Sequence, residues 1–106
     1  MTEADWQETI IDVARTLHWR VAHFRAARTV HGWRTPVSAD GKGFPDLCLT
    51  RDRIIFVELK ADAGKLSDEQ EEWQHRLCAA GAETYIWRPG DDWEAICDIL
   101  RRRRPA

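Results

Sequence analysis

The sequence of 106 residues lacks any apolar run close to the roughly 20 residues that a membrane-spanning helix requires. Its first five residues are acidic in character, with Glu3 and Asp5, and they lack the apolar segment of a signal peptide. Internal repeats, low-complexity tracts and linkers are also absent. These absences argue against a membrane protein and a repeat array. They predict one domain over residues 1–106, located in the cytoplasm.

Cysteine is scarce, and its spacing excludes two kinds of site. Cys48, Cys78 and Cys97 form no C-x-x-C motif, so neither a zinc ribbon nor a redox motif is indicated. An odd number of cysteines in a cytoplasmic protein argues against disulfides. Because the neighbouring residues are apolar, we expect the three thiols to be buried.

Acidic residues are absent between Asp12 and Asp40, although the whole chain has a formal net charge of −2. This window contains Arg15, Arg20, Arg25, Arg28 and Arg34, together with His18, His23 and His31. A mildly acidic protein with such a basic stretch can hold phosphates locally. The alternative is a solvated loop that is rich in arginine.

Hydrophobic periodicity predicts the element order α-β-β-β-α-β-α. The expected helices cover residues 3–17, residues 67–80, and a last segment capped by Asp91 with Trp93, Ile96, Cys97 and Leu100 on its inner face. The expected strands are residues 19–25, 46–50, 54–60 and 83–88. Residues 26–45 show little periodicity and are expected to form a long functional loop. This order predicts an α/β fold with a central mixed sheet flanked by helices.

Asp46, Glu58 and Lys60 form the most informative pattern. Alternation along a strand places Glu58 and Lys60 on one face, and a hairpin brings Asp46 opposite them because both lie far from the turn. Charges near the end of a buried strand are costly unless they are paired or bound. Carboxylates suit Mg²⁺, which polarises a phosphate and lowers the pKa of a bound water, and a lysine can orient or deprotonate that water. The alternative is a buried ion pair with no ligand.

At this point the chain resembles a known family. Gly43-Phe44-Pro45-Asp46 followed by Val57-Glu58-Leu59-Lys60 resembles the signature of the PD-(D/E)xK nuclease superfamily. More narrowly, it resembles the virus-type replication-repair nuclease (VRR-NUC) domain, which is similar to archaeal-type Holliday junction resolvases. The resemblance covers nearly the whole chain, since it includes a Glu-x-x-x-Gln helix from Glu3 to Gln7 and the Leu66-Ser67-x-x-Gln70 helix start.

The resemblance implies a restriction-endonuclease-like fold in which Asp46, Glu58 and the Leu59 backbone carbonyl bind Mg²⁺ or Mn²⁺. It also implies a structure-selective DNA endonuclease that hydrolyses phosphodiester bonds in branched DNA, such as Holliday junctions. Paired incisions in a four-way junction require a two-fold homodimer.

Two further residues are candidates for the catalytic set. Glu3 lies on the helical stripe that faces the sheet, whereas Glu8 lies on a polar face, so we prefer Glu3 as the acid of the first helix. Glu3 could instead only complement the positive end of that helix. Gln70 fits either a capping box with Ser67 or the surroundings of the active site, and both interpretations stay open.

DNA contacts are expected from residues 26–42, where cations and an aromatic ring suit phosphate binding and base stacking: Arg28, His31, Trp33, Arg34 and Lys42. Lys65 either touches phosphate or is a solvated loop lysine. Residues 101–106 are expected to be a basic tail, with phosphate binding by the four arginines as the alternative. Nothing resembles a major-groove recognition helix, which favours structure-selective over sequence-specific cutting.

Two other functions are compatible with these patterns. One is a nucleic-acid-binding module that keeps the nuclease fold but does not cut. The other is a protein-interaction domain in which the three charges form a structural ion-pair network. Intact Asp46, Glu58 and Lys60 argue against the binding module.

Overall fold

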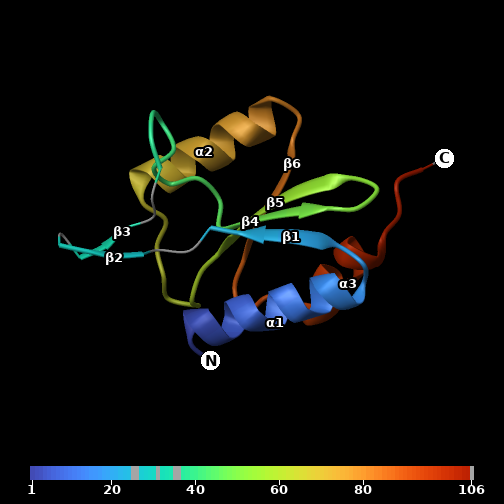
Figure 1. Cartoon of the computed structure of the whole chain (residues 1–106). Helices are drawn as coiled ribbons and strands as arrows, with labels where there is room; N and C mark the ends of the chain where they lie inside the picture. The colour runs from blue at the N-terminus through green and yellow to red at the C-terminus, as the bar shows by residue number, and fades with distance from the viewer. Residues whose placement is uncertain (25–26, 31, 35–36, 106) are drawn as a thin grey trace.

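A computed structural model describes residues 1–24, 27–30, 32–34 and 37–105 of the chain (Figure 1). The elements, in chain order, are α1 (Glu3–Thr16), β1 (Arg20–His23), β2 (Ala27–Thr29), β3 (Gly32–Arg34), β4 (Leu47–Thr50), β5 (Ile54–Leu59), α2 (Asp68–Ala79), β6 (Glu83–Trp87) and α3 (Trp93–Arg101). Within the described ranges, no helix combines the length and the apolar character that crossing a bilayer demands.

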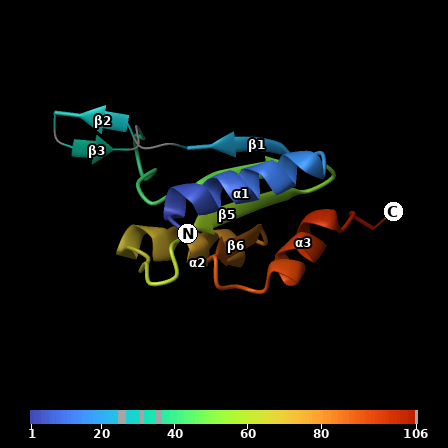
Figure 2. The same cartoon turned by 90° about the horizontal axis from the view of Figure 1, so that it is seen from below.

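Four strands form the central sheet in the order β1-β4-β5-β6. β1 and β5 each pair antiparallel with β4, whereas β6 pairs parallel with β5. Figures 1 and 2 show α1 and α3 on one face of this sheet and α2 on the other. The parallel pair needs a crossover connection, and α2 supplies it between β5 and β6. The expected α/β fold with a mixed, helix-flanked sheet is confirmed, and it is of the restriction-endonuclease-like kind.

The two faces of the sheet differ in how deeply they are buried. The hydrophobic core joins alternate residues of β4 and β5 to the inner faces of α1 and α3: Leu47, Leu49, Ile55, Val57, Leu59, Trp6, Ile10, Ala14, Ile96 and Leu100. By contrast, α2 contains no fully buried residue, and the structure describes all of it. Glu58 is the one buried charged side chain of the described residues, and it contacts Gln70 of α2. The α2 face therefore carries polar groups that the opposite face excludes.

The prediction of a long loop over residues 26–45 was wrong in part, because this segment contains a hairpin. β2 and β3 pair antiparallel with Thr29 opposite Gly32, and Gly32 adopts a φ of 94°. Each strand has three residues, which is too short for alternation to be visible in the sequence. Positive φ at Gly32 closes the turn, since glycine has no Cβ to oppose it.

Several side chains at the periphery also differ from expectation. All three thiols were expected to be buried, but Cys78 is exposed and Cys48 is half-buried. The expectation is confirmed for Cys97. Trp93 is 38% exposed, although its ring packs edge-to-face against the core residue Trp6 at a centroid distance of 6.0 Å. The expected cap of α3 at Asp91 was wrong by one residue: the N-cap is Asp92, whose side chain accepts from the backbone N–H groups of Glu94 and Ala95. Apolar neighbours in the sequence do not reveal which face of a helix meets the core.

The C-terminal arginines continue beyond α3 along the β4–β5 turn. Arg51 donates from Nη2 to the Arg102 carbonyl over 2.7 Å, and the backbone N–H of Arg104 donates to the Asp52 carboxylate. The guanidinium of Arg51 also lies 4.4 Å from the ring centroid of Trp19, a favourable cation–π distance. The backbone is therefore attached to the turn as far as Arg104, while the side chains of residues 101–104 are exposed.

Candidate active site

Asp46 and Glu58 meet at one end of the sheet. Asp46 directly precedes β4, and Glu58 is the last but one residue of β5. Leu47 is paired with Val57, so continuing this register by one residue places Asp46 opposite Glu58. Oδ2 of Asp46 accepts a hydrogen bond of 3.0 Å from the backbone N–H of Leu59. The antiparallel pair therefore brings the two carboxylates together as the hairpin prediction required.

The environment of Glu58 disfavours its charge. Burial raises the pKa of Glu58 to about 8, and the negative charge of Asp46 and a hydrogen bond shared with it act in the same direction. The positive charge of Lys60 lowers this pKa, but by less. A hydrogen bond between two carboxyl groups requires that one of them is protonated. When both are ionised, Oε2 of Glu58 has no hydrogen-bond partner among the described residues.

Gln70 connects α2 to Glu58. Its Oε1 accepts from the backbone N–H of Ser67 over 2.9 Å, and its own backbone N–H donates to Ser67 Oγ over 3.2 Å. Because an N–H can only donate, the amide oxygen must face Ser67, which leaves Nε2 to donate to Oε1 of Glu58 over 3.1 Å. The capping box and the contact with the carboxylate, which the sequence left as alternatives, are both present in this one side chain.

Lys60 follows β5 directly, and its backbone is fixed at the sheet end. Its N–H donates to the Trp87 carbonyl over 3.1 Å, and the same oxygen accepts from Nε1 of Trp6 over 3.0 Å. Trp6 therefore attaches the first turns of α1 to the strand end where Lys60 and Glu58 lie. The Lys60 side chain is half-buried.

The loop that leads to Asp46 is held against α2. Gly43 has a φ of 84°, and a Cβ there would lie 2.6 Å from the Glu69 carbonyl carbon and 2.7 Å from the Gln70 nitrogen. The Phe44 ring packs edge-to-face with Trp73 at a centroid distance of 5.0 Å. Gly43 thus allows a backbone approach to α2 that a larger residue would prevent.

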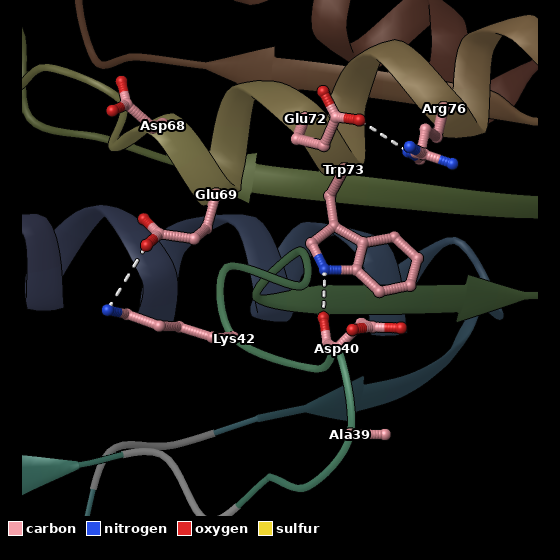
Figure 3. Close-up of a pocket in the computed structure, with 8 residues that line it drawn as sticks. All are labelled: Ala39, Asp40, Lys42, Asp68, Glu69, Glu72, Trp73 and Arg76. Atoms are coloured by element: carbon pink, nitrogen blue, oxygen red, sulfur yellow. Dashed lines mark hydrogen bonds and ion pairs between the residues drawn. The ribbon is translucent and has the colours of Figure 1, made fainter.

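Asp46, Glu58, Lys60 and Gln70 do not line the cavity of about 860 Å³ that Figure 3 shows. It is lined by Ala39, Asp40, Lys42, Asp68, Glu69, Glu72, Trp73 and Arg76. The Trp73 indole donates to the Asp40 carbonyl over 3.0 Å. The two cations of the lining are each paired with an acid: Lys42 with Glu69 at 3.3 Å, and Arg76 with Glu72. Its acidic lining makes this cavity unfavourable for phosphate.

The remaining candidates from the sequence lie at varying distances from this centre. Glu3 is exposed at the start of α1, and Glu8 is exposed further along the same helix. Within the described ranges, no hydrogen bond or ion pair links either of them to Asp46, Glu58 or Lys60. Lys65 is exposed in the β5–α2 loop. Arg28 lies in β2, and Trp33 and Arg34 lie in β3. The structure describes the backbone of these three residues but not their side chains. His31 falls outside the described residues.

Sequence reasoning missed Arg88, which holds the loop after Lys60. Its Nη1 donates to the carbonyls of Ala61, over 2.8 Å, and Gly64, over 2.5 Å. Nearby, Oδ1 of Asp62 accepts from the Gly90 N–H over 2.6 Å. These contacts fix the loop that joins Lys60 to α2. Because the Arg88 acceptors are backbone carbonyls, which every residue has, no sequence pattern reveals them.

The donor set suits a hard divalent cation. Among the described residues, no three His, Cys, Asp or Glu side chains gather closely enough to hold a metal. However, Mg²⁺ usually binds one or two carboxylates and keeps several waters. Two adjacent carboxylates with one buried, unpartnered oxygen on Glu58 form an arrangement that a dication would stabilise. The residues present therefore fit such an ion.

The fold and this paired-carboxylate end define an α/β protein of the restriction-endonuclease-like class. The VRR-NUC domain profile matches residues 23–88, more than half of the chain. The chain therefore belongs to the VRR-NUC family, which is a nuclease family. Asp46, Glu58, Lys60 and Gln70 lie inside the matched range, whereas Glu3 lies outside it. No curated protein and no solved structure matches the chain.

Proposed function

We propose that this chain is a Mg²⁺- or Mn²⁺-dependent deoxyribonuclease that cuts branched DNA, such as four-way junctions, by hydrolysis of phosphodiester bonds. The observation that carries the proposal is the pair of adjacent carboxylates, half-buried Asp46 and buried Glu58, at one sheet end of a VRR-NUC chain. Such a pair is costly without a cation. We also propose that residues 1–106 act as one domain in the cytoplasm.

Each residue of the candidate site has a distinct part in this proposal. Asp46, Glu58 and the Leu59 carbonyl hold the metal, and Gln70 orients Glu58 through its 3.1 Å hydrogen bond. When bound, the metal polarises the scissile phosphate and lowers the pKa of a water. Lys60 orients the attacking water or offsets negative charge that develops on the phosphate. Glu3 is the candidate acid from α1.

DNA binding is assigned to the cations and the aromatic residue that the sequence singles out. These are Arg28, His31, Trp33, Arg34, Lys42 and Lys65. The Lys42 side chain is largely exposed and its ion pair with Glu69 is weak, so it would contact a phosphate outside the acidic cavity that it helps to line. A homodimer related by a two-fold axis would present two active sites to the two strands that junction resolution must cut.

The test is cleavage of end-labelled four-way junction, flap and linear duplex DNA with Mg²⁺, Mn²⁺ or EDTA. Wild type is compared with Asp46→Ala and with Asp98→Ala, an exposed carboxylate on α3. We expect metal-dependent cutting that Asp46→Ala abolishes and Asp98→Ala leaves intact. If folded wild-type protein binds these DNAs and cuts none of them, the chain is a non-catalytic binding module.

A further inference from the structure

The β2–β3 hairpin stands apart from the central sheet on the side of the candidate site. β2 and β3 form their own two-stranded sheet, and Figures 1 and 2 both show it beyond the end of β1. Phe24, the residue after β1, donates its backbone N–H to the Asp46 carbonyl over 2.9 Å. The chain therefore leaves the sheet toward the hairpin at a residue bonded to the candidate metal ligand.

The hairpin ends in an apolar side chain that the fold leaves in water. Val30, which follows β2, is 95% exposed, more than any other large hydrophobic residue described. An apolar side chain stabilises a structure when it is removed from water. Val30 thus contributes nothing by burial to this fold, and the gain is available to a partner that covers the hairpin tip.

Charge favours DNA as this partner. The sequence from residue 13 to residue 39 contains no acid, and it places Arg28 and Arg34 in the two hairpin strands. On the other side of the candidate site, the first turns of α2 carry Asp68, Glu69, Glu71 and Glu72. Phosphates are attracted to the basic side and repelled from the acidic one. A nucleic acid bound at Asp46 is therefore directed along the hairpin.

The hairpin is long enough to reach the bases. Strands rise about 3.3 Å per residue, so strands of this length extend roughly 10 Å from the hairpin base. This exceeds the depth of either groove of B-DNA, about 8 Å. Apolar side chains of DNA-bending proteins insert between base pairs and unstack them. Unstacking is least costly where bases are already unpaired or disturbed, which is the situation at a branch point.

We propose that the β2–β3 hairpin is a wedge that enters the branch point of DNA, with Val30 against the disturbed base pair and the strand arginines on the flanking phosphates. This inference rests on the proposed function, because it names the feature that makes the same site selective for branched DNA. It assigns selectivity to the hairpin and hydrolysis to the sheet end, so the two can fail separately.

The wedge is tested without cleavage, in EDTA, with 2-aminopurine at the branch of a four-way junction. We expect wild-type protein to increase the fluorescence at the branch but not in a linear duplex, and Val30→Ser to lose most of this increase. Val37→Ser is the matched control, because Val37 is also exposed, at 50%, but lies outside the hairpin. Anisotropy titrations check that all three proteins bind the junction. An equal increase with Val30→Ser, an equal increase in the duplex, or no binding by wild type would overturn the proposal.

Cleavage with Mg²⁺ separates the wedge from the nuclease. Loss of the burial of one valine predicts that Val30→Ser lowers the ratio of junction to duplex cutting about ten-fold, with duplex cutting unchanged. If Val30→Ser cuts both substrates like wild type, the wedge is wrong and the nuclease stands. If wild type cuts nothing but the fluorescence increase depends on Val30, the nuclease is wrong and the wedge stands.

Discussion

The side-chain amide of Gln70 donates a hydrogen bond of 3.1 Å to the buried carboxylate of Glu58. This amide cannot rotate freely, because its oxygen accepts from the Ser67 N–H at the start of α2. A local helix cap therefore sets the orientation of a group at the end of a neighbouring strand.

Replacing Gln70 by Glu should separate the helix cap with Ser67 from the hydrogen bond to Glu58. Glu also completes a capping box, but it offers Glu58 a negative charge in place of a donor. Loss of a hydrogen bond to a charged group predicts a fall in the cleavage rate of at least about ten-fold, while the thermal unfolding temperature stays close to wild type. Gln74→Glu on the same helix is the control, since Oε1 of Gln74 only accepts, from Thr84. Wild-type cleavage by Gln70→Glu would remove Gln70 from the site.

The raised pKa of Glu58 predicts an unusual dependence of stability on pH. In EDTA, between pH 4.5 and about 8, the folded state keeps a proton on Glu58 that the unfolded state has released. The folded state then binds more protons, so the contribution of Glu58 to the free energy of unfolding falls as pH rises through this range. Urea denaturation of wild type and Glu58→Gln at pH 5, 6.5 and 8 measures it, because the variant lacks this titration. Identical pH slopes for the two proteins would contradict the prediction.

Mg²⁺ should restore the stability that the folded state loses at high pH. A metal binds the ionised carboxylates of the folded state and stabilises it by mass action. We expect the thermal unfolding temperature at pH 8 to rise with Mg²⁺ for wild type and to stay constant for Asp46→Ala. A rise of equal size in both proteins would place the ion elsewhere on the chain.

Gly43 and Gly81 share a backbone conformation but differ in their surroundings, so substitutions at the two positions separate backbone strain from steric contact. Gly43 and Gly81 have φ of 84° and 85°, but a Cβ at Gly81 meets nothing within 4 Å, whereas one at Gly43 meets the α2 backbone. Gly81→Ala should therefore cost about 1–2 kcal/mol of stability from the left-handed conformation. Gly43→Ala should cost about 1–3 kcal/mol more from overpacking and should also lower cleavage. Equal losses of stability, measured by urea denaturation, would show that α2 yields to the new methyl group.

Arg88 should act on catalysis through the loop after Lys60. Arg88→Ala removes the hydrogen bonds to the Ala61 and Gly64 carbonyls, so we expect kcat to fall with little change in KM. Guanidinium ions at millimolar concentration should restore part of the activity, because they can occupy the vacated donor position. Arg76→Ala, which removes an exposed ion pair on α2, should change neither parameter. If guanidinium ions fail to restore the activity of Arg88→Ala and its KM rises, Arg88 contacts DNA instead.

The sequence predicted those features that depend on local geometry. Alternation along β5 and a short turn determine that Asp46 faces Glu58, since a slip by one residue would expose the core side chains. The Ser67–Gln70 cap is likewise local. The contact from Gln70 to Glu58 depends on where α2 packs, so the sequence could offer it only as one of two alternatives. The short strands β2 and β3 gave no alternation to detect.

The shared carbonyl of Trp87 has a consequence for how far this chain can be shortened. The family match begins at residue 23 and ends at residue 88, so a fragment with those limits retains Asp46, Glu58, Lys60 and Gln70 but loses the indole of Trp6. It also uncovers the apolar face of β4 and β5, which α1 and α3 bury. The candidate site and half of the hydrophobic core that supports its strands are thus encoded in different parts of the chain. Transplanting the matched segment into another protein would move the carboxylates and α2 without the two helices that cover the opposite face of the strands carrying them.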